Sequence, residues 1–228
     1  MNETKPYIRL ENVTKQYRSS AVKYSALRGI NLNIYKREFV AIMGPSGAGK
    51  TTLLNIIGLL DKPTTGSYQL DGTEVMHQNE KQLSRLRRDG FGFVFQTANL
   101  LPKFNLLQNV EMPMLYRRFK HKESRQYAER ILTQLGLKDK LKNRPSQLSA
   151  GQLQRGAIAR ALIQSPNIIL ADEPTGNLDT ASSIEIMNIM RYLNNQGMTI
   201  ILVTHSQEVA NYAHRILYVR DGQLVGAL

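Results

Sequence analysis

The chain has 228 residues, of which 42% are hydrophobic and 21% charged, with a net charge of +12 and no cysteine. This composition is typical of a globular chain with a well-filled core, and the lack of cysteine excludes disulfide scaffolds, cysteine metal sites and thiol catalysis. The N-terminal segment does not resemble a secretory signal, and the longest apolar stretch, Leu53–Leu60, is far shorter than the roughly 20 residues that cross a bilayer. We therefore expect a soluble intracellular chain.

The first third of the chain has the pattern of strands joined by turns. Apolar and polar residues alternate over Tyr7–Val13 and Ile30–Ile34, and Glu38–Met43 is an apolar run that ends at a glycine, typical of a strand buried on both faces. We predict a helix over Lys50–Leu60 and a hairpin over Ser67–Val75 that turns at Asp71-Gly72.

The segment from about Thr97 to Gln164 changes character. Tyr127–Leu135 has helical spacing and stops at Gly136, and Gln152–Ile163 is a second helical pattern rich in Ala and Leu. No strand pattern is evident between these two. We interpret the segment as a helical insertion in an α/β domain.

Strand patterns return in the last third. Asn167–Ala171 and Thr199–Val203 are apolar runs, with a helical pattern over Ala181–Leu193 between them. This order predicts a right-handed crossover in a parallel sheet. Ile216–Val225 has the pattern of a second hairpin, with its turn at Asp221-Gly222.

Most of the positive charge lies in the middle of the chain. Lys81 to Arg144 holds 15 Lys and Arg against 5 Asp and Glu. A basic balance favours an anionic partner such as nucleic acid, a lipid surface or phosphates. These charges are scattered, however, and do not alternate with the aromatic residues on which single-stranded nucleic acid would stack. We favour a solvated helical surface over a nucleic-acid site, and we expect this surface, including Arg117 and Arg118, to lie near anionic lipid headgroups.

The strongest motif is Gly44–Thr51, GPSGAGKT, which fits G-x-x-x-x-G-K-[ST] in full between a predicted strand and a predicted helix. Its glycines permit a turn that aims successive N–H groups at phosphate oxygens, and the helix start adds its positive end. Lys50 would supply a full charge to the β- and γ-phosphates, and the hydroxyl of Thr51 suits Mg²⁺. The motif predicts a nucleoside triphosphate site.

Two polar clusters follow predicted strands and extend this site. Asp172 is placed to reach Mg²⁺, and the adjacent Glu173 to orient and deprotonate an attacking water. His205 follows the strand Thr199–Val203. Because ligands of open α/β sheets bind at the carboxyl ends of the strands, we expect His205 to contact the γ-phosphate.

A second anion site is predicted within Gln147–Arg155, QLSAGQLQR. The hydroxyl of Ser149 and the N–H groups near Gly151 lie at the start of a predicted helix, where phosphate binds favourably. A chain with two phosphate-binding helix starts predicts an ATP held between two copies, with one site from each.

Together these motifs resemble the ATP-binding subunit of an ABC transporter over nearly the whole chain, and Leu148–Gln152 resembles the signature motif of that family. The resemblance implies an α/β fold, a P-loop NTPase (RecA-like) core with an antiparallel β subdomain and an inserted α-helical subdomain. The chain would then be a single ABC ATPase domain, with the nucleotide-binding core over 1–96 and 165–228 and the helical subdomain over 97–164.

The resemblance also implies roles for individual residues. Glu173, His205 and Gln96 would be catalytic, and Gln96 resembles the glutamine-loop residue that touches Mg²⁺ and the nucleophilic water. Tyr17 is placed like the aromatic residue that stacks on adenine, with a half-buried strand-end tyrosine as the structural alternative. Asn177–Asp179 resembles the loop that crosses to the partner's site. The expected Mg²⁺ contacts are Thr51, Gln96 and Asp172. The expected nucleotide contacts are Tyr17, Gly44, Pro45, Ser46, Gly47, Ala48, Gly49, Lys50, Thr51, Thr52, Ser149, Gly151, Gln152 and Asp179.

Three segments, Leu59–Gly66, Phe91–Leu101 and Asp172–Asp179, resemble the macrolide-export and lipoprotein-release type of this family (MacB/LolD-like). This resemblance implies ATP and Mg²⁺ as cofactors, and a second copy and integral membrane permease subunits as partners. The chain would act in the cytoplasm, peripheral on the inner face of the cell membrane, and energise export or release of a substrate. The alternatives are a regulatory ATPase that signals through a membrane protein, and a soluble ABC ATPase that acts on nucleic acid.

One residue departs from the family pattern. Ala150 stands where the signature motif usually has a glycine. An alanine is compatible with the motif if φ at this position is negative, although contact with the opposite copy's γ-phosphate would be loosened. Glu173 is intact, so we expect an active ATPase.

Overall fold

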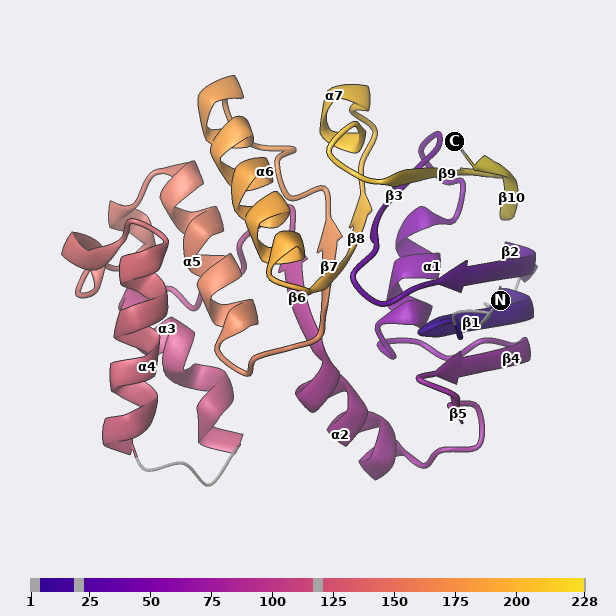
Figure 1. The fold of residues 1–228 in the computed structure, drawn as a ribbon, viewed down its shortest axis with the longest axis horizontal. Helices are drawn as coiled ribbons and strands as arrows, with labels where there is room; N and C mark the ends of the chain where they lie inside the picture. The colour runs from indigo at the N-terminus through magenta and orange to yellow at the C-terminus, as the bar shows by residue number, and fades with distance from the viewer. Residues whose placement is uncertain (1–4, 19–22, 117–120, 228) are drawn as a thin grey trace.

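The computed structural model describes residues 5–18, 23–116 and 121–227. A six-stranded sheet in the order β10-β9-β3-β8-β7-β6 forms the centre of the molecule (Figure 1). Its strands are β3 (Phe39–Met43), β6 (Phe91–Phe95), β7 (Ile168–Asp172), β8 (Thr199–Val203), β9 (Arg215–Arg220) and β10 (Gln223–Ala227). All neighbouring pairs are parallel except β9 and β10. The carboxyl ends of β3, β7 and β8, each followed by a predicted site motif, therefore meet at one edge.

A second, antiparallel sheet in the order β2-β1-β4-β5 lies at one end of the molecule. It consists of β1 (Ile8–Arg18), β2 (Lys23–Ile34), β4 (Thr65–Leu70) and β5 (Thr73–Glu74). β1 and β2 are longer than the alternating segments that we predicted. Their register shifts between Leu10 and Val13, where Asn12 has a φ of +50°, so the alternation breaks while the pairing continues to Arg18.

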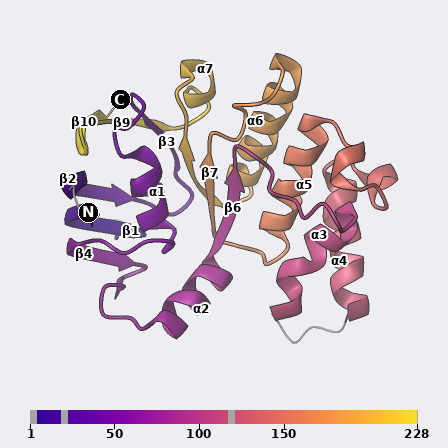
Figure 2. The same ribbon diagram turned by 180° about the vertical axis from the view of Figure 1, so that it is seen from behind.

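The helices separate into groups. α1 (Lys50–Ile57) lies between the two sheets, and α6 (Thr180–Asn195) and α7 (Gln207–Ala210) follow β7 and β8. At the end opposite the antiparallel sheet lie α3 (Leu106–Glu111), α4 (His121–Gln134) and α5 (Ala150–Leu162), as both views show (Figures 1 and 2). Three short 3-10 segments connect elements of this group, Met112–Tyr116, Lys138–Lys140 and Pro145–Gln147.

The core divides at the central sheet. One cluster of buried side chains, which includes Ile8, Leu53 and Ile201, joins the antiparallel sheet and α1 to one face. A second cluster, which includes Phe39 and Ile158, joins α3 to α6 to the other face. Every residue of β3 and β8 is buried, as the continuous apolar runs predicted, because helices or strands cover both faces.

Several boundaries differ from the prediction. α1 ends at Ile57 rather than at Leu60, because Gly58 caps it and Leu59 takes a left-handed φ of +58°. α5 begins at Ala150, two residues before the predicted start, because Ser149 caps it. β7 and β8 are parallel neighbours joined through α6, which confirms the predicted parallel sheet. α2 (Glu80–Gly90), β6 and α3 were not predicted as elements.

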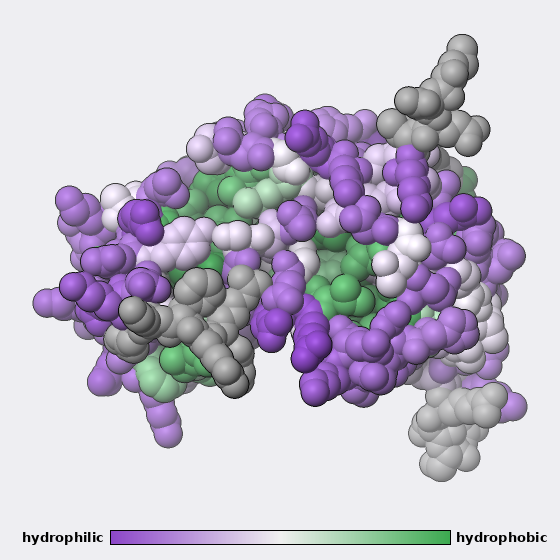
Figure 3. All heavy atoms as spheres, turned by 60° about the horizontal axis from the view of Figure 1, so that its bottom comes forward, coloured by the Kyte–Doolittle hydropathy of each residue, from purple (hydrophilic) through white to green (hydrophobic). Residues whose placement is uncertain are grey.

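No helix within the described residues has the length and apolar composition needed to span a bilayer. The face shown in Figure 3 is mostly hydrophilic, with its apolar surface gathered in hollows. The basic residues Lys103, Lys138, Lys142 and Arg144 are all exposed, as expected for a solvated surface. The predicted contribution of Arg117 and Arg118 to a lipid-facing surface lies outside the described residues.

Candidate functional site

The glycine-rich loop between β3 and α1 has the backbone that a phosphate cradle requires. Gly44, Gly47 and Gly49 have φ values of +148°, +77° and +102°, a region that side chains disfavour. A Cβ added to Gly44 would lie 2.0 Å from the carbonyl oxygen of Val219. Glycine is therefore required at this position both by the backbone conformation and by the neighbouring strand.

The last hairpin of the chain supports this loop from the side. The amide of Gly222 donates to the carbonyl of Ala48 over 3.0 Å, and the amide of Arg28 in β2 donates to the carbonyl of Gly222 over 2.8 Å. The β9–β10 turn therefore connects the glycine-rich loop to the antiparallel sheet.

An open pocket of about 380 Å³ lies in front of the loop. Its lining includes predicted residues from three strand ends: from the loop and α1, from β7, and from β8. The full lining, in which Tyr24 and Val203 were not predicted, is Tyr24, Ser46, Gly47, Gly49, Lys50, Thr51, Thr52, Asp172, Glu173, Val203 and His205. The ammonium of Lys50 donates to the carbonyls of Gly44 and Pro45, at 2.8 and 2.9 Å, which holds its charge at the mouth of the loop.

Asp172 and Thr51 form the polar pair expected for a divalent cation. Burial raises the pKa of Asp172, the adjacent Glu173 adds to this rise, and a hydrogen bond with Thr51 and the charge of Lys50 oppose it. The described residues contain no cluster of three or more His, Cys, Asp or Glu side chains that would hold a metal by itself. One carboxylate with one hydroxyl fits Mg²⁺, which binds few protein oxygens and takes its other contacts from phosphates and water.

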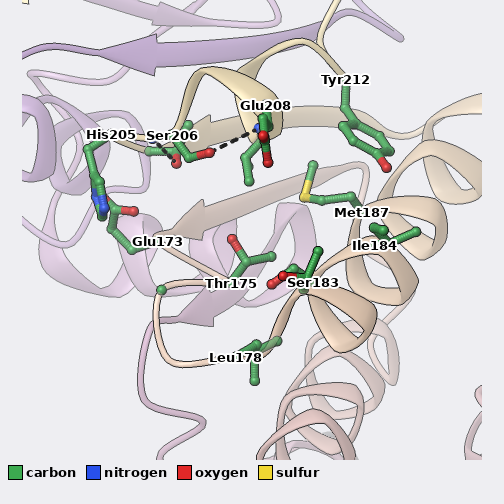
Figure 4. Close-up of a pocket in the computed structure, with 14 residues that line it drawn as sticks. Glu173, Thr175, Leu178, Ser183, Ile184, Met187, His205, Ser206, Glu208 and Tyr212 are labelled. Carbon is green, nitrogen blue, oxygen red and sulfur yellow. Dashed lines mark hydrogen bonds and ion pairs between the residues drawn. The ribbon is translucent and has the colours of Figure 1, made fainter.

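Glu173 and His205 lie together beside this pair. The Nδ1 atom of His205 is 2.9 Å from Oε1 of Glu173, and Figure 4 shows the two side chains side by side at the edge of a second pocket of about 320 Å³. Glu173 has a left-handed φ of +49°, a strained conformation for a residue other than glycine, and its amide donates to the carbonyl of Val203. A carboxylate that is carried on a strained backbone and held by an imidazole suits a general base.

Gln96 follows β6 and is exposed. Its amide nitrogen lies 3.4 Å from Oδ1 of Asn177, and the Asn177 amide lies 3.5 Å from the carbonyl of Gln96, so the two loops contact each other. A Cβ added to Gly176 would lie 2.8 Å from Nε2 of Gln96, so the glycine allows this close approach. Gln96 does not line the pocket in front of the phosphate loop, as far as the described residues define it.

Tyr17 is held to the segment that follows α1 by contacts with two residues, Asp61 and Lys15, that the sequence did not indicate. Its hydroxyl donates to Oδ2 of Asp61 over 2.8 Å, and Lys15 pairs with Oδ1 of Asp61 while its Nζ lies 4.9 Å from the ring centroid of Tyr17. Burial raises the pKa of the Tyr17 hydroxyl, a hydrogen bond with Thr52 lowers it, and Asp61 raises it. The ring is 41% exposed, which leaves a face available for stacking.

Tyr24 is a site residue that sequence reasoning missed. It pairs with Tyr17 across β1 and β2, lines the pocket, and donates from its hydroxyl to the carbonyl of Gly47 over 3.0 Å. Only the strand register brings it to the phosphate loop, and no motif marks it.

The predicted second anion site lies on a different element. Ser149 is the N-cap of α5 and forms a capping box with Gln152, whose amide donates to the serine hydroxyl over 3.3 Å. Ala150 does not have a positive φ, which is the condition under which alanine is compatible with the motif. Gly151 approaches α6 closely, because an added Cβ would lie 2.8 Å from Oγ of Ser182.

Asp179 caps α6 in the same way. Its carboxylate accepts from the amide and the hydroxyl of Ser182, and these hydrogen bonds lower the pKa of Asp179. Among the described residues, Ser149, Gly151, Gln152 and Asp179 do not line the pocket at the phosphate loop of their own chain. The arrangement therefore comprises a pocket at the glycine-rich loop with the Glu173–His205 pair beside it, and a separate capped helix start outside that pocket's lining.

Comparison with known proteins gives a consistent result. A family model described as ABC transporter matches residues 27–176. The chain is 50% identical to YvrO of Bacillus subtilis, an uncharacterized ABC transporter ATP-binding protein, over 95% of this chain and 94% of the relative. It is 48% identical to the macrolide export ATP-binding/permease protein MacB of Marinobacter nauticus, over 97% of this chain but 34% of MacB, so it spans about a third of that relative.

Two solved structures resemble this fold closely. One is a dimeric, post-hydrolysis state of the ATP-binding cassette MJ0796 bound to ADP and Pi, with a TM-score of 0.90 and 43% identity over 97% of both chains. The other is a dimeric structure of MJ0796, a bacterial ABC transporter cassette, with a TM-score of 0.90 and 44% identity.

Proposed function

The chain belongs to the ABC transporter family as an ATP-binding subunit that hydrolyses ATP, and from this premise we propose that two copies pack head to tail and hold two ATP molecules between them. The observation that carries this proposal is the separation of the two anion sites. The phosphate loop has its own pocket, and Ser149 at the start of α5 is outside that pocket's lining. Both MJ0796 structures are dimeric, and one of them is bound to ADP and Pi, which supports the pairing of two copies.

In each site, we assign the triphosphate of ATP to the backbone of Gly44–Thr51 and to Lys50. We assign the adenine ring to the exposed face of Tyr17. The left-handed glycines and the N-terminus of α1 supply N–H donors without side-chain obstruction. Thr51 and Asp172 would hold Mg²⁺ with Gln96. When bound, this ion neutralises charge on the β- and γ-phosphates.

The proposed hydrolysis uses residues at the carboxyl ends of β7 and β8. Glu173 accepts the proton of the attacking water, and Gln96 orients that water. His205 holds Glu173 through Nδ1 and contacts the γ-phosphate. Loss of the γ-phosphate removes the contact that Ser149 and Gly151 of the second copy make with it, so hydrolysis favours opening of the dimer.

We further propose that the dimer drives membrane-spanning permease subunits. This proposal is supported by the similarity to MacB, which is described as an ATP-binding and permease protein and of which this chain matches about a third. The helical subdomain over 97–164 and the loop at Gln96 would transmit the motion, with residues 1–96 and 165–228 as the nucleotide-binding core. In this role the chain would lie on the cytoplasmic face of the membrane and energise the export or release of a substrate by the permease subunits. Purification from membranes, with identification of the membrane protein that accompanies the chain, tests this role and separates it from a signalling role.

Substitution of Glu173 tests the chemistry. Glu173→Gln is expected to keep ATP binding, lower turnover by at least about a hundredfold, and form a stable dimer with ATP on size-exclusion chromatography. Lys50→Ala is expected to weaken ATP binding itself. Hydrolysis by Glu173→Gln at the original rate would refute the assigned base, and a strictly monomeric ATP complex of this variant would refute the shared site.

A further inference from the structure

Helix α5 contacts the chain on both sides of Gln96. On one side, the side-chain amide of Gln154 donates to the carbonyl of Phe95 over 2.9 Å. On the other, the guanidinium of Arg160 donates to the carbonyls of Ala98 and Asn99, over 2.8 and 2.7 Å. The only residues between these anchors are Gln96 and Thr97.

Gln154 is buried and Arg160 is half-buried. Gln154 is 2% exposed, so its hydrogen bond to Phe95 is protected from competition by water. Burial lowers the pKa of Arg160, and its two described acceptors are main-chain carbonyls rather than carboxylates. Asn99, which accepts from Arg160, has a left-handed φ of +47°, so the loop turns sharply where the guanidinium holds it. A loop held in this way has little freedom to move independently of the helix.

The same helix begins at the second anion site. Ser149, five residues before Gln154, caps it through the box with Gln152. Over the 13 residues of α5, backbone hydrogen bonds make the helix a rigid rod of about 20 Å. A displacement of Ser149 therefore moves Gln154 and Arg160 with it.

We propose that Gln154 and Arg160 are positioning residues that fix the Gln96 loop to α5. The start of α5 contacts the ATP that is bound to the phosphate loop of the partner copy, whereas Gln96 acts on the ATP that is bound to the phosphate loop of its own copy. The position of α5 therefore sets the position of Gln96. This inference rests on the proposed shared site. It makes α5 a mechanical connection between the two nucleotides, in which contact of one γ-phosphate with Ser149 favours the hydrolytic position of Gln96 at the other. Such a connection is a coupling free energy between two sites.

The test is a double-mutant cycle on steady-state ATP hydrolysis. Gln154→Leu and Arg160→Lys are each expected to lower kcat about tenfold and to change the affinity of the monomer for a fluorescent ATP analogue by less than about twofold. In a Gln96→Ala background, the same substitutions are expected to lower kcat by less than about twofold, because their effect passes through Gln96. An equal loss of kcat in both backgrounds would overturn the proposal, since it would show a general structural role.

Glu185→Gln is the matched control. It removes an ion pair that α5 makes through Arg155 with α6, away from the Gln96 loop, and is expected to keep kcat. If Arg160→Lys fails to fold, Gln154→Glu tests the other anchor, at Phe95, because it keeps the side-chain length and removes the amide donor. ATP-dependent dimerisation of the double variant Glu173→Gln, Gln154→Leu separates the proposed role of α5 from the proposed shared ATP site. Persistence of the dimer with unchanged kcat for Gln154→Leu contradicts only the role of α5, whereas a Glu173→Gln chain that stays monomeric contradicts the shared site.

Discussion

The Nδ1 atom of His205 lies 2.9 Å from Oε1 of Glu173, although the two residues follow different strands of the central sheet, β8 and β7. The carboxylate is largely buried and the imidazole largely exposed, with side-chain exposures of 18% and 73%. The pair is therefore anchored on the glutamate side and open on the histidine side, where the phosphates are proposed to bind.

This geometry predicts the effect of removing the ring. His205→Ala is expected to lower kcat about a hundredfold, because Glu173 loses the group that holds it, and to change ATP affinity by less than about threefold. Single-turnover hydrolysis with saturating ATP, together with equilibrium binding, measures the two effects separately. A large loss of affinity with a preserved single-turnover rate would assign the histidine to binding instead.

The contact of Tyr17 with Asp61 predicts that two substitutions of Tyr17 weaken adenine binding to different degrees. Tyr17→Ala is expected to weaken ATP binding about tenfold through loss of stacking, and Tyr17→Phe only about threefold through loss of the hydroxyl. Neither substitution is expected to change the binding of inorganic tripolyphosphate, which has no base. Equal losses of affinity for ATP and for tripolyphosphate would mean that the ring of Tyr17 supports the phosphate loop and does not stack on adenine.

Asp61 also predicts a pH dependence of stability. Burial raises the pKa of Asp61, but hydrogen bonds from Lys15, Tyr17 and the amide of Lys62 outweigh it, and the net pKa is below the usual value. A lowered folded-state pKa stabilises the fold above the unfolded-state pKa of about 4, and this stabilisation is lost as the pH falls through the folded-state value. Urea midpoints of Asp61→Asn are therefore expected to lie below those of the original chain at pH 7 and to converge with them in acid. Asp71→Asn, which removes an exposed pair with Lys36, is the control.

Tyr24, which belongs to no sequence motif, is expected to contribute to nucleotide binding. Tyr24→Phe removes the hydrogen bond to Gly47 and is expected to weaken both ATP and tripolyphosphate binding about fivefold, because the bond orders the loop that holds the phosphates. Isothermal titration calorimetry measures both ligands. Tyr35→Phe, at an exposed tyrosine beyond the end of β2, is expected to leave both affinities unchanged.

A stability prediction comes from the junction of the antiparallel sheet with α1. The hydroxyl of Tyr68, which is fully buried, donates to the carbonyl of Ile57 over 2.6 Å. Tyr68→Phe is expected to lower the free energy of unfolding by about 1–2 kcal/mol, because a buried hydrogen bond is lost while the ring remains packed. Denaturant unfolding measures this change, and an unchanged midpoint would show that the bond contributes no net stability.

The site was predictable from sequence where chemistry and local pattern coincide. The phosphate loop, Asp172-Glu173 and His205 each follow an apolar strand, so their motifs and their places on the sheet could be inferred together. Tyr24 and Asp61 could not, because the first depends on the β1–β2 register and the second on where α1 ends. The missed helix α2 buries only Leu83, so it has almost no apolar stripe, although Asn79 and Gln82 form a capping box that marks its start.

The support of the phosphate loop by Gly222 has a consequence for biosynthesis. The loop precedes β7, β8 and the turn at Gly222 in the chain, so it leaves the ribosome before the turn that connects it to β2. A nascent chain therefore lacks this support of its glycine-rich loop until Gly222 has emerged from the ribosome, which disfavours ATP capture before that point.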